Sequence, residues 1–97
     1  MTGTTRSSAG LDLRRRKLLF RSWHRGMREM DLIMGGFADA RVEHLGEGEL
    51  AEFERLIEVP DRDLLAWITG ETAVPPDFDS ALFRDLCAFH LTPGGGG

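Results

Sequence analysis

The chain has 97 residues, of which 41% are hydrophobic and 29% charged, and its net charge is −4. These values are typical of a single soluble domain with a modest core, and no apolar run is long enough for a transmembrane helix. The single cysteine excludes an intramolecular disulfide and suits a reducing compartment. The charge is unevenly divided: it sums to +7 up to Arg28 and to −11 from Glu29 onward. Such an asymmetry can steer association with a partner.

Residues 1–10 are rich in serine, threonine and glycine, and we expect them to form a disordered lead. They lack the apolar segment of a secretory signal. We therefore expect a bacterial cytoplasmic protein, with a trimmed form in the mitochondrial matrix as the alternative.

The first helix is predicted to begin at Leu11 or Asp12, with Asp12 as its N-cap, and to end at His24 or Arg25. The basic cluster Arg14–Lys17 lies near its start, where cations oppose the helix dipole. The cluster is interpreted either as a solvated face or as a partner-binding surface. A small helical nucleic-acid-binding protein is a third interpretation, which the acidic remainder of the chain disfavours.

The second helix is predicted from Met27 or Arg28 to about Arg41. Its apolar residues follow the helical repeat closely, and they are Met30, Ile33, Met34, Phe37 and Ala38. We expect the methionines to fill the core. The pair Gly35–Gly36 interrupts this pattern, which predicts either a kink or the close approach of another backbone.

The third helix is predicted over residues 49–59, because Pro60 prevents its continuation. A short fourth helix follows, with Asp61 or Asp63 as its cap and Gly70 as its C-terminal stop.

The fifth helix is predicted from Asp77 or Asp79 to Phe89, and residues 92–97 form a flexible glycine tail. No strand-like alternation is present. The fold class is therefore all-α: a compact five-helix bundle in one small domain, residues 11–91, with disordered termini.

A corner is predicted between the first two helices. Gly26 can take the left-handed backbone conformation that closes a helix. Arg25 lies in the last turn of the first helix, and Glu29 and Asp31 lie near the start of the second, where their charges suit the helix dipoles. In the plainest interpretation, Arg25 and Glu29 only brace this corner through a surface ion pair.

No set of residues predicts catalysis or a metal site. His24, His44 and His90 belong to different elements, and Cys87 forms only a lone C-x-x-H pair with His90. A zinc site normally needs three or four protein ligands. We therefore expect a core cysteine and a surface histidine, no catalytic residue, no metal and no enzyme; Cys87 as a nucleophile is a remote alternative.

The corner resembles the R-G-x-x-E signature of the SdhE family, which promotes assembly of succinate dehydrogenase. The matching residues are Arg25, Gly26 and Glu29, with Asp31 two positions on. The similarity covers roughly residues 14–90, and it continues in register through Phe37-Ala38, Phe53-Glu54-Arg55-Leu56-Ile57 and Asp61-x-Asp63-Leu64-Leu65-x-Trp67-Ile68.

This resemblance implies an assembly factor that binds the flavoprotein subunit of succinate dehydrogenase, or of the related fumarate reductase. Such a factor promotes the covalent attachment of FAD to a histidine of that subunit. It would hold no cofactor stably, because the FAD is that of the partner, and neither nucleic acid nor membrane insertion is expected. The residues expected to bind the partner are Arg25, Gly26 and Glu29, then Asp31, with Arg28, Trp23 and His24 beside them.

Overall fold

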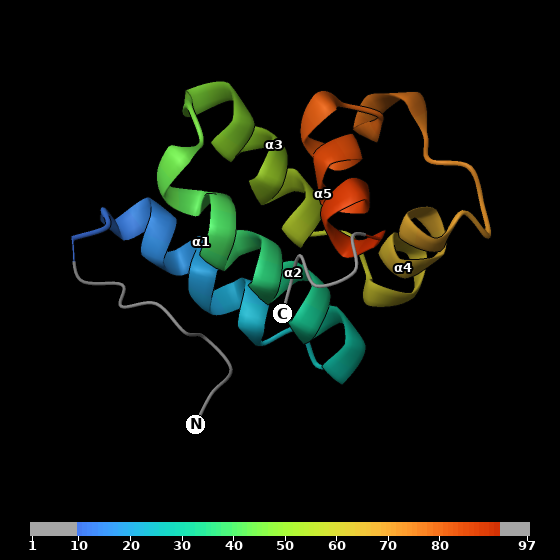
Figure 1. Ribbon diagram of the computed structural model, residues 1–97, viewed down its shortest axis with the longest axis horizontal. Coiled ribbons are helices and arrows are strands. Elements are labelled where there is room, and N and C mark those ends of the chain that lie inside the picture. Colours follow the sequence, from blue (N-terminus) through green and yellow to red (C-terminus); the bar gives the residue numbers. More distant parts are fainter. Residues whose placement is uncertain (1–9, 92–97) are drawn as a thin grey trace.

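The computed structural model describes residues 10–91 and is built from five α-helices (Figure 1). They are α1 (Leu13–Trp23), α2 (Arg28–Arg41), α3 (Glu47–Ile57), α4 (Asp61–Thr69) and α5 (Ala81–Leu91), with short 3-10 helices at Val42–His44 and Pro76–Phe78. No strand occurs among the described residues, so the predicted all-α five-helix fold is confirmed. The predicted disordered lead, apart from Gly10, and the glycine tail lie outside the described residues.

Helix α2 packs against the first and the last helix. It lies beside α1, and its other side contacts α5 (Figure 1). Helix α3 contacts both α1 and α5, and α4 packs against α5. The corner between α1 and α2 lies close to the point where α3 ends and α4 begins, because Arg25 contacts Ile57 and Asp61 there.

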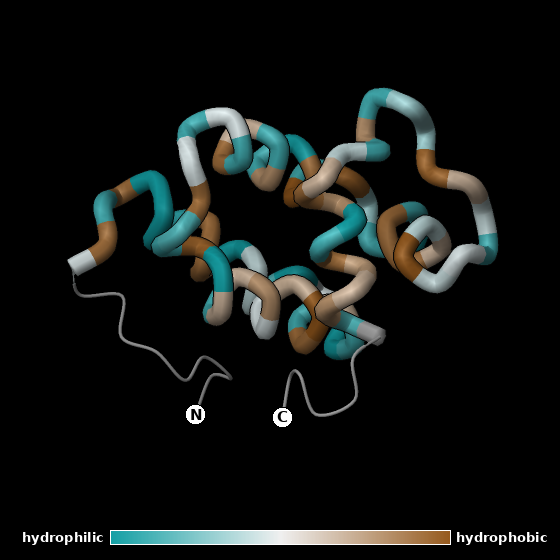
Figure 2. Tube along the Cα trace, turned by 45° about the horizontal axis from the view of Figure 1, so that its top comes forward, coloured by the Kyte–Doolittle hydropathy of each residue, from teal (hydrophilic) through white to brown (hydrophobic). Residues whose placement is uncertain are grey.

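The apolar face of α2 lies in the core, as its helical repeat predicts. Met30, Met34 and Phe37 are completely buried. Figure 2 shows that hydrophobic and hydrophilic segments alternate along the helices. The ring of Phe37 meets those of Phe53 and Phe89 edge-on, with centroids 5.7 and 5.8 Å apart. The two methionines are thus core residues, as expected.

The third helix starts earlier than predicted. It begins at Glu47 because the carboxylate of Glu49 accepts the backbone N–H of Gly46 at 2.9 Å, half of a capping box. It also ends at Ile57, so Val59 belongs to the turn that follows.

The fifth helix starts later than predicted. Asp79 has a non-helical backbone (φ −85°, ψ 74°) after the separate turn Pro76–Phe78. The hydroxyl of Ser80 then accepts the N–H of Phe83 at 3.1 Å, so Ser80 begins the helix in place of either aspartate.

The predicted caps have mixed outcomes. Gly70 closes α4 with φ +83°, which confirms its role. Asp12 occupies the N-cap position of α1, but its carboxylate pairs with Arg15 at 2.9 Å and caps no N–H. Within residues 10–91, no helix has the length and apolar character needed to cross a bilayer.

Candidate partner-docking site at the corner of the first two helices

The backbone of the corner turns at Gly26, which has φ +102°. This confirms the predicted left-handed conformation, which an L-residue adopts only with strain. The N–H of Arg25 donates to the carboxylate of Asp31 at 2.5 Å, so the residue before the glycine is fastened to the first turn of α2. Asp31 is consequently occupied inside the corner.

The side chain of Arg25 is buried, with only 6% of its surface exposed. Its Nε donates to Asp61 at 2.7 Å, and its two terminal nitrogens donate to the carbonyls of Ile57 (2.5 Å) and Val59 (2.7 Å). A guanidinium carries five donors in a fixed fork, which suits the unpaired carbonyls at the end of α3. The expectation of an exposed Arg25 is therefore corrected, and its carboxylate partner is Asp61 in place of Glu29.

Other predicted site residues do lie on the surface. His24, Gly26, Arg28 and Glu29 are exposed. The His24 ring stacks on Phe20, with centroids 3.9 Å apart, and its Nδ1 lies 2.7 Å from the Phe20 carbonyl oxygen. His24 is thus held in one orientation at the edge of the corner.

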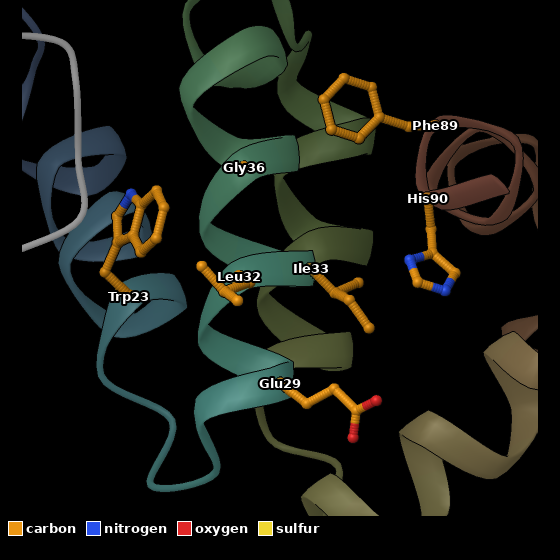
Figure 3. A pocket seen from close by; sticks show the side chains of 7 residues that line it. All are labelled: Trp23, Glu29, Leu32, Ile33, Gly36, Phe89 and His90. Carbon is orange, nitrogen blue, oxygen red and sulfur yellow. The ribbon is translucent and has the colours of Figure 1, made fainter. Parts of the chain in front are cut away.

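A groove of about 400 Å³ opens beside the corner (Figure 3). Its lining residues come from the end of α1, from α2 and from α5, and they are Trp23, Glu29, Leu32, Ile33, Gly36, Phe89 and His90. Glu29 belongs both to the corner and to this groove. Leu32 is 55% exposed and was missed by the sequence analysis. Its signal was present, since it is an apolar residue outside the buried stripe of α2.

We call Gly26, Arg28, Glu29 and Leu32 the docking face. These four residues are exposed, and they present a glycine with positive φ, two opposite charges and an apolar side chain in one short stretch. Such a mixture suits a protein interface, where an apolar centre is ringed by polar groups.

Trp23 lies half-buried at the edge of the groove, with its indole over Gly35. The close approach predicted at Gly35–Gly36 is therefore made by a side chain in place of a backbone. The indole Nε1 is buried and has no hydrogen-bond partner among residues 10–91.

Half of the basic cluster Arg14–Lys17 is engaged within the protein. Arg14 binds both carboxylate oxygens of Glu54, at 2.8 and 2.9 Å, and also pairs with Glu47. Arg15 donates to two backbone carbonyls after α2, those of Val42 and Leu45. Arg16 and Lys17 are exposed, so the cluster is not a purely solvated face: half of it is held in contacts within the protein.

A metal site and the pair Cys87 and His90 were also considered from the sequence. The described residues contain no group of three His, Cys, Asp or Glu side chains that could hold a metal ion. Cys87 is half-buried, and desolvation raises the pKa of its thiol, which opposes formation of the nucleophilic thiolate. His90 is exposed, as expected of a surface histidine.

Comparisons with known proteins give a consistent result. Residues 16–90 match the Sdh5 family model, described as the flavinator of succinate dehydrogenase. The FAD assembly factor SdhE of Acetobacter pasteurianus is 36% identical over 76 residues, which cover 78% of this chain and 70% of that protein. The mitochondrial succinate dehydrogenase assembly factor 2 of Dictyostelium discoideum is 37% identical over 70 residues, or 72% of this chain and 50% of that protein.

The corresponding factor of Schizosaccharomyces japonicus is 37% identical over 91 residues, which cover 93% of this chain and 64% of that protein. The chain thus spans about half to two thirds of the length of these mitochondrial relatives. The family match begins within α1 and ends within α5, so it covers the corner and all or most of each of the five helices. The chain belongs to the Sdh5 family, the flavinators of succinate dehydrogenase.

Proposed function

We propose that this protein is an assembly factor that binds the flavoprotein subunit of succinate dehydrogenase and promotes the covalent attachment of FAD to it. Family membership carries the proposal, because the family and its relatives are described by this role. A fumarate reductase flavoprotein is the second candidate partner. We place the protein in the bacterial cytoplasm, with the mitochondrial matrix as the alternative.

The docking face is the surface we assign to this binding. Its Glu29 and Gly26 belong to the R-G-x-x-E signature, both are exposed, and the groove beside Glu29 offers room for a partner side chain. Arg28 supplies a cation next to that carboxylate. Arg25 and Asp31 contribute from inside, by fixing the backbone that carries these groups.

Orientation is the contribution we assign to this chain. The flavin and the histidine that accepts it both belong to the partner, so the assembly factor needs no catalytic residue and holds no FAD of its own. By binding the flavoprotein most tightly when its flavin and histidine face each other, the protein raises the population of that arrangement. Correct orientation alone can lower a barrier by several kcal/mol.

Co-expression tests the function. The flavoprotein subunit is expressed with the wild-type protein, with Gly26→Val, with Glu29→Ala, or alone, and covalent flavin is read as fluorescence that survives denaturing electrophoresis. We expect strong fluorescence with the wild type and weak fluorescence with both variants. Equal fluorescence with and without the wild type would remove the function.

The site has its own control. Glu71→Ala removes an exposed acid outside the docking face, and we expect wild-type fluorescence from it. If Gly26→Val and Glu29→Ala also match the wild type, the function stands and the docking face is wrongly assigned.

A further inference from the structure

We infer that Asp61, the first residue of α4, is a positioning residue for partner docking: it holds Arg25 and thereby sets the course of the backbone through Gly26 to Glu29. This inference rests on the proposed function. It assigns to Asp61 a role other than the helix cap predicted for it, since Pro60 occupies the N-cap position of α4 and Asp61 caps no N–H.

The first step is the environment of the guanidinium. Arg25 and Asp61 are both largely buried, with 6% and 17% of their side chains exposed, and their atoms Nε and Oδ1 are 2.7 Å apart. Among the described residues, Asp61 is the one carboxylate in ion-pair contact with Arg25. A buried guanidinium that loses its carboxylate is left with an uncompensated charge and moves toward water.

The second step is the set of other contacts that Arg25 makes, which its movement would disturb. The remaining donors of Arg25 hold the carbonyls of Ile57 and Val59, so the pair ties the corner to the junction of α3 and α4. The main chain of the same residue is held by Asp31 of α2. Arg25 is therefore the point at which three helices meet the corner.

The third step is the lack of other packing at the turn. A Cβ built at Gly26 would meet no atom within 4 Å, so the turn is open on the side to which a side chain would point. The turn is anchored by Arg25 on one side and by the half-buried Met27 on the other. Release of the Arg25 side chain leaves its main chain held by Asp31 and weakens one of these two anchors, and the exposed Arg28 and Glu29 follow directly after them in the chain.

The first test uses the unbound protein and ¹⁵N NMR. Asp61→Asn keeps the size of the side chain and removes its charge. Asp63→Asn is the matched control, because Asp63 is an exposed acid in the same first turn of α4. We expect Asp61→Asn to shift the Arg25 Nε–H signal and the backbone amides of Gly26 and Glu29, at unchanged helix content, and Asp63→Asn to leave them in place.

Unshifted Gly26 and Glu29 amides in Asp61→Asn would overturn the inference. If Asp61→Asn does not fold, Asp61→Glu serves the same comparison, since it keeps the charge and displaces it by one methylene. This test needs no partner, so its outcome is independent of the proposed function.

The second test measures the dissociation constant for the purified flavoprotein subunit of succinate dehydrogenase, per folded molecule. We expect Asp61→Asn to weaken binding about tenfold in the wild-type background. In the Arg25→Gln background the same substitution should weaken binding less than about threefold, because the two residues act through one contact. Equal losses in both backgrounds, or an equal loss from Asp63→Asn, would overturn the inference. A wild-type protein that does not bind the subunit would remove the proposed function, and the docking role of Asp61 with it.

Discussion

The indole ring of Trp23 covers the α-carbon of Gly35, so closely that a Cβ built there would lie within 2.6 Å of three ring atoms. Glycine is therefore required at this position of α2 by the side chain of α1 that packs on it. We predict that Gly35→Ala lowers the free energy of unfolding. Overpacking against the indole costs about 1–3 kcal/mol. The better helix propensity of alanine offsets about 1 kcal/mol of this cost. Urea denaturation measures the difference.

The neighbouring glycine provides the control. A Cβ at Gly36 would lie 3.7 Å from the Phe89 ring, an ordinary contact, so Gly36→Ala should raise the free energy of unfolding by up to about 1 kcal/mol. The effect of Gly35→Ala should change sign when Trp23 is also alanine. A loss of stability that persists in the Trp23→Ala background would contradict this account.

The positive φ of Gly26 makes a separate prediction. There is open space around it, so Gly26→Ala meets no clash, but φ +102° strains any L-residue, and we expect a loss of about 1–3 kcal/mol in the free energy of unfolding. Gly48→Ala, also in open space and at ordinary φ inside α3, should stabilise the protein. If Gly26→Ala and Gly48→Ala have the same free energy of unfolding, a side chain at Gly26 causes no backbone strain, and the prediction is wrong.

The ion pair between α1 and α3 predicts a dependence of stability on pH. The hydrogen bonds from Arg14 hold the pKa of Glu54 below its ordinary value of 4.5. A carboxyl whose pKa is lowered on folding stabilises the protein above its unfolded pKa, and this contribution is lost as the pH falls through the folded value. Glu54→Gln should therefore be less stable than the wild type at neutral pH, and the difference should shrink below about pH 4.5.

Thermal unfolding at a series of pH values measures this difference. Glu71→Gln is the control, since Glu71 is exposed and has no ion pair with the described residues. A difference in thermal stability between wild type and Glu54→Gln that stays constant from neutral to acid pH would contradict this prediction. It would show that the Arg14–Glu54 ion pair does not cause the pH dependence.

Local patterns predicted the parts of this fold that depend on near neighbours in the chain. The repeat of Met30, Met34 and Phe37 defined the buried face of α2, and Gly26 and Gly70 have the positive φ expected of glycines after helices. The start of α3 was missed by two residues because the Gly46–Glu49 interaction was overlooked, although it is also local.

The role of Arg25 could not be predicted in this way. Its partners lie 32 to 36 residues further along the chain, at a junction whose position depends on how α3 and α4 pack. The same holds for Trp23, whose contact with Gly35 depends on the packing of α1 on α2. Sequence therefore located the corner, whereas packing decided which of its residues face inward.

Glu29 and Arg25 should accordingly respond differently to substitution. Glu29 is exposed, so Glu29→Ala should leave the free energy of unfolding within about 0.5 kcal/mol of the wild type. Arg25→Gln removes a buried charge from its partners and should cost several kcal/mol. If Glu29→Ala destabilises the protein more than Arg25→Gln does, it is wrong to assign Glu29 to the exposed docking face and Arg25 to the internal contacts.

Covalent flavin attachment in a purified system tests the central claim most directly. The apo-flavoprotein subunit of succinate dehydrogenase is mixed with FAD, alone or with the wild-type protein, Glu29→Ala or Glu71→Ala, and protein-bound flavin is followed over time after denaturation. We predict faster attachment with the wild type and with Glu71→Ala, and a rate close to that without any factor for Glu29→Ala. The same rate with and without the wild-type protein would contradict the account.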